Sequence, residues 1–266
     1  MLVVAIVVLG GSVEAEAPHL AAELGITEYE AKLALRSGSP SVVLRTPDRA
    51  RALDLLARLR GRGHEVVACD QTAMVPSSAM TSLRRFAIEP DGLVATDVPG
   101  SHLPWGDILA LLRATHRVRI ETHTEQVEKK FRPAAALATG GVILTKTVTR
   151  DVVKTSDDRI PVLYLFRRSG ERPWLLHATG THYTTLGPLL KPTQMDNFQT
   201  TVRLLRERAT SASYDERLLQ VRSLSERATR SDAVTHEAAP LAEGIDVLAH
   251  VLALWYVHQG PSAYRG

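Results

Sequence analysis

The chain has 266 residues, of which 44% are hydrophobic and 23% are charged, and its formal net charge is +3. These values are ordinary for a globular chain with one large or two smaller domains. Acidic and basic residues alternate without forming a basic stripe, so the charge pattern does not favour nucleic-acid binding. The single cysteine, Cys69, excludes an internal disulfide framework.

The N-terminal residues up to Leu9 are all apolar, and Val3–Leu9 is rich in β-branched residues. The run is too short to span a bilayer and has no basic region before it. We therefore expect a buried strand here, in a cytoplasmic protein without a membrane segment.

A first domain is predicted over residues 1–70. Thr27 and Glu30 have the spacing of a capping box, Gly38 is suited to end a helix, and Pro47 is suited to the first turn of one. The elements predicted after the first strand are a helix over Pro18–Leu24, a helix over Glu28–Arg36, a strand over Ser41–Arg45, a helix over Arg49–Arg60 and a strand over His64–Ala68. The resulting order, βααβαβ, is that of a split βαβ unit.

Residues 1–70 also resemble a known module. Leu24-Gly25-Ile26, Glu30-Ala31-Lys32 and Pro40 ahead of a valine strand are similar to the C-terminal domain of the bacterial ribosomal stalk protein, and the adaptor ClpS has a related fold. In the stalk family this domain recruits translation factors through a helical face, on which Lys32 matches a lysine. The resemblance implies a protein-binding surface, for which Glu28, Lys32 and Arg36 are the candidate residues.

A linker is predicted over residues 71–82 and an antiparallel β domain over 83–210. The predicted elements of this domain are strands at Leu83–Ile88, Leu93–Thr96 and Leu103–Trp105, a helix at Asp107–Thr115, strands at Val118–His123, Val142–Val148, Val162–Arg167 and Trp174–His177, and a helix capped by Thr193. Short strands closed by a helix indicate a partly open barrel, an arrangement that resembles pleckstrin-homology-like domains. The fold class is therefore α+β. The chain also resembles uncharacterised bacterial proteins that join these two parts.

A helical extension is predicted over residues 211–266, with an exposed helix at Tyr214–Arg227 and a strong helix at Leu241–His258. The second helix has a wide apolar face that must be covered, either within the chain or by a second copy. The stripe that would form a homo-oligomer interface consists of Leu241, Ile245, Leu248, Leu252 and Trp255.

Histidines are the main candidates for chemistry. His177 and His182 lie five residues apart, and His123 alternates with Glu121 and Glu125 on a predicted strand. Convergence of His123, His177 and His182 would form a hydrolytic metal site, although this spacing matches no zinc motif. The alternative is that these residues lie on solvated strand faces.

Neither a G-x-S-x-G elbow nor a glycine-rich phosphate loop occurs in the sequence. We therefore expect no catalytic residue and no cofactor. The favoured hypothesis is a non-catalytic adaptor or scaffold that binds a protein partner. The alternatives are a metal-dependent hydrolase and a protein that binds nucleic acid weakly.

Overall fold

A computed structural model describes residues 1–36, 39–131, 145–221 and 241–259, and it describes their side chains except those of 117–158 and 241–243. The chain divides into two compact units. The first unit combines residues 1–116 with 160–266, and the second contains residues 117–159. The separate folding of the predicted domains 1–70 and 83–210 stays a prediction.

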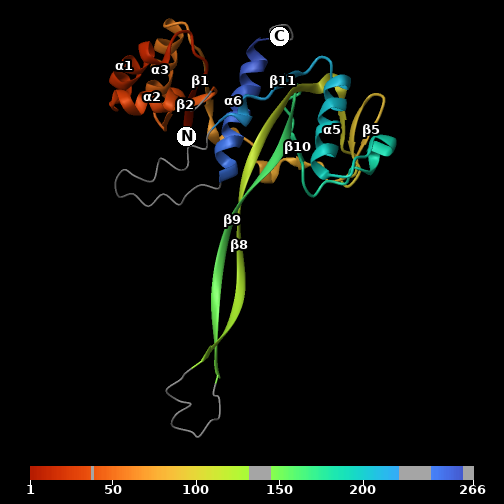
Figure 1. Cartoon of the computed structure of the whole chain (residues 1–266). Helices are drawn as coiled ribbons and strands as arrows, with labels where there is room; N and C mark the ends of the chain where they lie inside the picture. Colours follow the sequence, from red (N-terminus) through yellow and green to blue (C-terminus); the bar gives the residue numbers. More distant parts are fainter. Residues whose placement is uncertain (37–38, 132–144, 222–240, 260–266) are drawn as a thin grey trace. The chain divides into compact units, whose positions relative to one another are not determined.

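The first 70 residues form one three-stranded sheet with helices (Figure 1). Its elements are β1 (Leu2–Val8), α1 (Val13–Leu24), α2 (Glu28–Arg36), β2 (Ser41–Thr46), α3 (Arg49–Gly61) and β3 (Glu65–Asp70). The sheet order is β2-β1-β3, and both neighbours are antiparallel to β1. The crossover β2-α3-β3 therefore spans β1, which is the predicted split arrangement.

Local sequence signals explain the ends of these helices. The capping box of α2 is confirmed, because Thr27 N–H donates to Glu30 Oε2 at 2.8 Å and Glu30 N–H donates to Thr27 Oγ1 at 3.2 Å. Helix α1 begins five residues earlier than predicted, because Ser12 Oγ caps it. In α3 the cap is Asp48, so Pro47 precedes the helix instead of opening it. Gly38 lies outside the described residues.

The elements described after residue 70 are strands, 3₁₀ turns and two helices, and two of the strands are long and continue into the second unit. They are η1 (Gln71–Ala73), η2 (Ser77–Ala79), β4 (Thr81–Ser82), β5 (Phe86–Ile88), β6 (Gly92–Ala95), β7 (His102–Pro104), η3 (Trp105–Asp107), β8 (Ile108–Phe131), β9 (Thr145–Arg167), β10 (Trp174–His177), η4 (Thr184–Leu189), α5 (Gln194–Arg208), β11 (Ser213–Asp215), η5 (Arg217–Leu219) and α6 (Leu241–Gln259). One sheet has the order β11-β8-β9-β10-β4, and the other has the order β5-β6-β7. The α+β class is confirmed, with open sheets in place of a closed barrel.

Three sequence predictions in this part need correction. The helix predicted at Asp107–Thr115 is the start of strand β8, because its apolar residues are buried on both faces of the sheet. The predicted linker at 71–82 contains two 3₁₀ turns and strand β4. The helix predicted at Tyr214–Arg227 is strand β11 and turn η5 as far as residue 221, and the remainder lies outside the described residues.

Helix α6 belongs to the core between the β2-β1-β3 sheet and the five-stranded sheet. Alternate residues of β1 point to opposite sides: Val4 and Ile6 pack against the helices α1 to α3, whereas Ala5 and Val7 join the cluster that contains α6. The same cluster includes Tyr164 and other residues from one face of the five-stranded sheet. The opposite face of that sheet packs against β5, β6, β7 and α5.

This position explains the wide apolar face predicted for α6. Leu248 and Leu252 are 2% and 0% exposed, and Ile245 and Trp255 are buried in the same cluster. The side chain of Leu241 lies outside the described residues. The chain itself therefore covers the described part of the stripe, which gives no support to a homo-oligomer through these residues.

The second unit contains the parts of β8 and β9 between residues 117 and 159. The two strands are neighbours in the sheet. The side chain of His123 belongs to this unit and lies outside those that the structure describes.

Candidate functional site

The residues predicted to form an interaction surface lie on α2, and their charges are paired within the chain. Lys32 Nζ lies 2.5 Å from Glu28 Oε1 one helical turn away. Arg36 Nη2 lies 2.5 Å from Glu14 Oε1 of α1. The three residues therefore share a helix, but neither basic side chain is free of an acidic neighbour.

The predicted histidines do not form a metal site within the described residues. His177 is half-buried at the end of β10, whereas His182 is exposed in the following loop. Among the described side chains, no group of three or more histidine, cysteine, aspartate or glutamate residues is placed to hold a metal ion. The ring of His177 instead lies near that of His116, with centroids 5.9 Å apart.

His116 belongs to a buried polar cluster that the sequence did not reveal. Asp246 Oδ1 accepts a hydrogen bond from the Tyr164 hydroxyl at 2.6 Å, and Asp246 Oδ2 accepts one from Ser77 N–H at 2.7 Å. His116 Nε2 lies 2.5 Å from the Tyr164 oxygen. Since the tyrosine proton points to Asp246, His116 Nε2 must donate to Tyr164. The cluster therefore joins β8, β9, α6 and turn η2 by satisfied hydrogen bonds.

Burial governs the protonation of this cluster. It lowers the pKa of His116 to about 4, outweighing the opposite effect of the nearby Asp246 carboxylate. Burial also lowers the pKa of His177 and of His250, whose Nε2 donates to the Val75 carbonyl. The imidazoles are therefore uncharged at neutral pH. The hydrogen bonds of the cluster hold β8, β9, α6 and turn η2 together.

Acid should therefore destabilise the protein before its carboxylates titrate. An unfolded histidine binds a proton near pH 6.5, whereas folded His116 resists protonation down to about pH 4, so stability falls as pH drops through this window. His116 alone should account for a loss of about 2 kcal/mol between pH 7.5 and pH 5. Urea unfolding at both pH values measures it. In the variant His116→Gln, the free energy of unfolding should depend correspondingly less on pH. An unchanged pH dependence would contradict the lowered pKa of His116.

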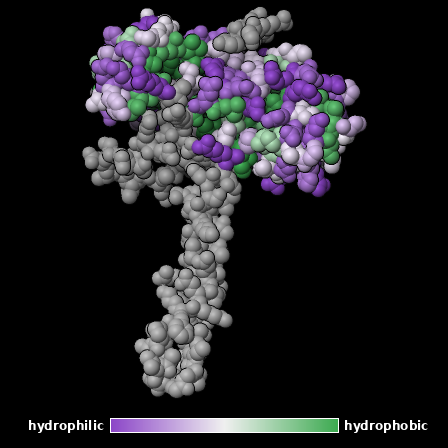
Figure 2. All heavy atoms as spheres, in the orientation of Figure 1, coloured by the Kyte–Doolittle hydropathy of each residue, from purple (hydrophilic) through white to green (hydrophobic). Residues whose placement is uncertain are grey.

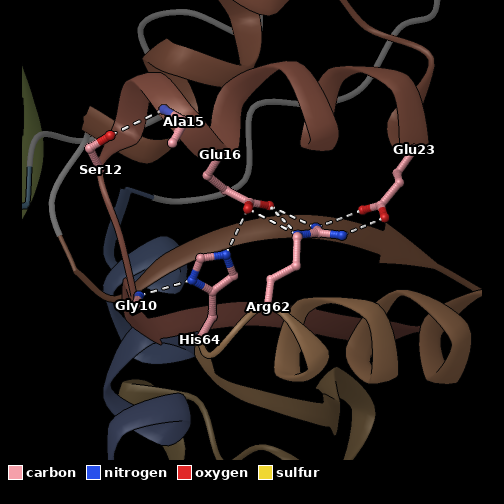
Figure 3. A network of polar contacts seen from close by, with 7 residues as sticks. All are labelled: Gly10, Ser12, Ala15, Glu16, Glu23, Arg62 and His64. Carbon is pink, nitrogen blue, oxygen red and sulfur yellow. Dashed lines mark hydrogen bonds and ion pairs between the residues drawn. The ribbon is translucent and has the colours of Figure 1, made fainter.

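A second polar network, shown in Figure 3, joins α1 to the end of α3 and to the segments next to β1 and β3. Arg62 donates to both carboxylate oxygens of Glu16 and of Glu23, with distances from 2.7 to 3.2 Å. His64 Nδ1 accepts from Gly10 N–H at 2.9 Å, and His64 Nε2 lies 2.8 Å from Glu16 Oε2. Glu16 is only 4% exposed. This network fixes Glu23, which also lines a groove.

The groove, called here the α1–α3 groove, lies between α1, β2 and α3 and has a volume of about 260 Å³. Polar atoms form the larger part of its exposed lining, and Leu24, Leu44 and Leu55 are the large apolar residues beside them. The complete lining consists of Ala22, Glu23, Leu24, Leu44, Arg51, Asp54, Leu55 and Arg58. On the face shown in Figure 2, hydrophobic residues of the N-terminal part adjoin hydrophilic ones.

The lining of the α1–α3 groove has two acidic residues and two arginines, and three of these four have an ion-pair partner among the described residues. Glu23 is bound by Arg62, and Asp54 Oδ2 lies 2.9 Å from Arg58 Nε. The exposed Arg51 guanidinium has no ion pair or hydrogen bond with any residue that the structure describes. One positive charge beside an apolar surface is therefore available to a ligand.

No protein-family model, curated protein or solved structure matched this chain. Across the described residues, no helix combines the length and apolar character needed to cross a membrane. The groove geometry is therefore the main basis for a functional proposal.

Proposed function

We propose that this is a non-catalytic adaptor or scaffold protein that binds a partner through the α1–α3 groove. The observation that carries the proposal is that Arg51 has no ion-pair partner among the described residues and lies beside Leu24, Leu44 and Leu55. Such a combination suits a protein segment that inserts an apolar side chain and presents a carboxylate to the arginine.

The position of Arg51 in α3 supports this proposal. Arg49 and Arg51 both lie in the first turn of α3, and that turn has no acidic residue after the Asp48 cap. Positive charge at a helix N-terminus opposes the helix dipole. An acidic partner would compensate this unfavourable positive charge. The groove should therefore prefer a negatively charged partner.

The size of the groove favours a side chain over a whole small molecule. Sites for drug-sized ligands and cofactors usually enclose about 300–1,000 Å³. A groove of about 260 Å³ is smaller than this range. It therefore fits best with an anchor residue of a peptide that continues across the protein surface.

The resemblance of residues 1–70 to the stalk-protein domain favours the same class of function, and a cytoplasmic location is part of the proposal. No described contact favours the hydrolase alternative, because the described histidines form no metal-binding group. Nucleic-acid binding likewise has no described contact in its favour. The interaction site proposed here lies on α1 and α3 instead of at Glu28, Lys32 and Arg36.

The proposal predicts that filling the groove abolishes peptide binding. Peptides selected from a displayed random library against the whole protein should carry an acidic residue near a large apolar one. Ala22→Trp, at an exposed groove position, should weaken their binding at least tenfold, or about 1.4 kcal/mol. Fluorescence polarisation with synthetic peptides measures this loss.

The matched control is Ala57→Trp, which places the same bulk at an exposed position of α3 outside the groove. This variant should bind as wild type does. Arg51→Glu should weaken acidic peptides selectively. Equal affinities for wild type and Ala22→Trp would reject the groove as the binding site.

A further inference from the structure

Tyr29 is an exposed aromatic residue that follows the groove residue Leu24 closely in the sequence. Its exposure is 71%, the highest among the large hydrophobic residues that the structure describes, and Ile26 nearby is 37% exposed. Glu28 and Glu30 flank Tyr29 on α2. The segment therefore combines apolar surface with the Glu28 carboxylate, whereas the Glu30 carboxylate accepts from Thr27 in the capping box, and an apolar group beside a carboxylate is the chemistry that the groove favours.

We infer that the α1–α3 groove of one molecule receives Tyr29 of a second copy of this chain. The inference rests on the proposed function of the groove and names a partner for it. Tyr29 would contact the apolar surface formed by Leu24 and Leu44, and the Glu28 carboxylate would face Arg51. Glu28 remains about half exposed in its pair with Lys32, so a second cation can reach it.

The placement of both features suits a two-fold dimer. Leu24 lines the groove, and Tyr29 follows it by only five residues, on a helix that packs against α1. In a two-fold interface the same patch occurs on both subunits, so each Tyr29 can enter the groove of the other molecule. Two matched contacts would then form around one axis.

Charge complementarity favours this occupant over an arbitrary apolar one. The first turn of α3 carries Arg49 and Arg51 without an acidic residue after the cap, whereas α2 has Glu28 and Glu30 in its first turn. In the dimer these unlike charges would face each other. Because the patch is small, the association should be weak and dependent on concentration.

Sedimentation of the whole protein over a range of concentrations tests the inference. Wild type should show a reversible monomer–dimer equilibrium. Tyr29→Ala and Ala22→Trp should each weaken it at least tenfold, whereas the control Ala57→Trp should not. Both altered positions are exposed, and circular dichroism checks that each variant is folded.

Mixing the two variants provides the sharper test. An equimolar mixture of Tyr29→Ala and Ala22→Trp retains one intact tyrosine and one intact groove, so it should form mixed dimers that neither variant forms alone. Arg51→Glu should also weaken dimerisation, and adding Glu28→Arg to the same chain should restore it. Failure of both rescues would overturn the assignment of Tyr29 to the groove.

The outcome also separates this inference from the proposed function. A wild type that stays monomeric, yet binds selected peptides in a manner blocked by Ala22→Trp, would overturn the dimer and support the groove as a partner site. A dimer that is unaffected by Tyr29→Ala would likewise overturn the inference. If Ala22→Trp changes neither dimerisation nor peptide binding, both proposals are wrong.

Discussion

Replacing Asp246 with alanine should lower the free energy of unfolding by about 3 kcal/mol. The substitution removes the acceptor for the Tyr164 hydroxyl and for Ser77 N–H, and a buried donor left unpaired costs about 1–3 kcal/mol. Asp246 is 4% exposed and Tyr164 is fully buried, so water cannot easily replace the lost acceptor. Urea unfolding at neutral pH measures the change.

Two further variants identify the cause of this loss. Tyr164→Phe removes the donor to Asp246 and the acceptor of His116 Nε2–H but leaves the bond from Ser77 N–H to Asp246 intact, and it should cost less than Asp246→Ala. If the two residues act together, the double variant should be less destabilised than the sum of the single effects, and the coupling energy should exceed about 0.5 kcal/mol. Strict additivity would show that the hydrogen bond between them does not contribute measurably.

Replacing Arg62 with methionine should destabilise the protein by about 3–5 kcal/mol at neutral pH. Removal of one partner from a buried ion pair leaves an uncompensated charge, here on Glu16. Burial by itself would raise the pKa of the Glu16 carboxyl, but hydrogen bonds from Arg62 and contact with His64 hold that pKa below its ordinary value. The variant loses the part of this compensation that Arg62 supplies.

The pH dependence of Arg62→Met distinguishes a buried charge from lost packing. Without Arg62, burial should raise the pKa of Glu16, so protonation would relieve the penalty as pH falls towards 5. The difference in stability from wild type should therefore shrink on acidification. Arg58→Met is the matched control, because the exposed Arg58–Asp54 pair should contribute at most about 1 kcal/mol. A pH-independent deficit in Arg62→Met would point to packing instead.

The N-terminal part was predictable because its signals are local. Thr27 and Glu30 cap α2 through contacts three residues apart, and the β-branched run at Val3 marks β1. In contrast, the start of β8 was mistaken for a helix. Its residues Ile108–Leu112 are apolar at every position because both faces of the sheet are covered, and such a run lacks the alternation that identifies a strand.

The candidate sites depended on contacts that are distant in sequence. Asp246 lies 82 residues from Tyr164 and 169 residues from Ser77, so its role as their acceptor is not visible in the apolar pattern of α6. In the sequence, Arg51 is one of several charged residues of α3. Only the pairing of Asp54 with Arg58 and of Glu23 with Arg62 shows that Arg51 remains available.

The place of α6 between two sheets has a consequence for synthesis of the protein. On the side of β1 that carries Ala5 and Val7, the cover includes α6, which is made much later than β1; Trp255, for example, donates to Glu65, 190 residues earlier in the chain. At about 5–20 residues per second, the ribosome needs roughly 10–40 s to cover this interval. During that time this apolar face of the sheet lacks the cover of α6, and such transiently exposed surface is prone to aggregation.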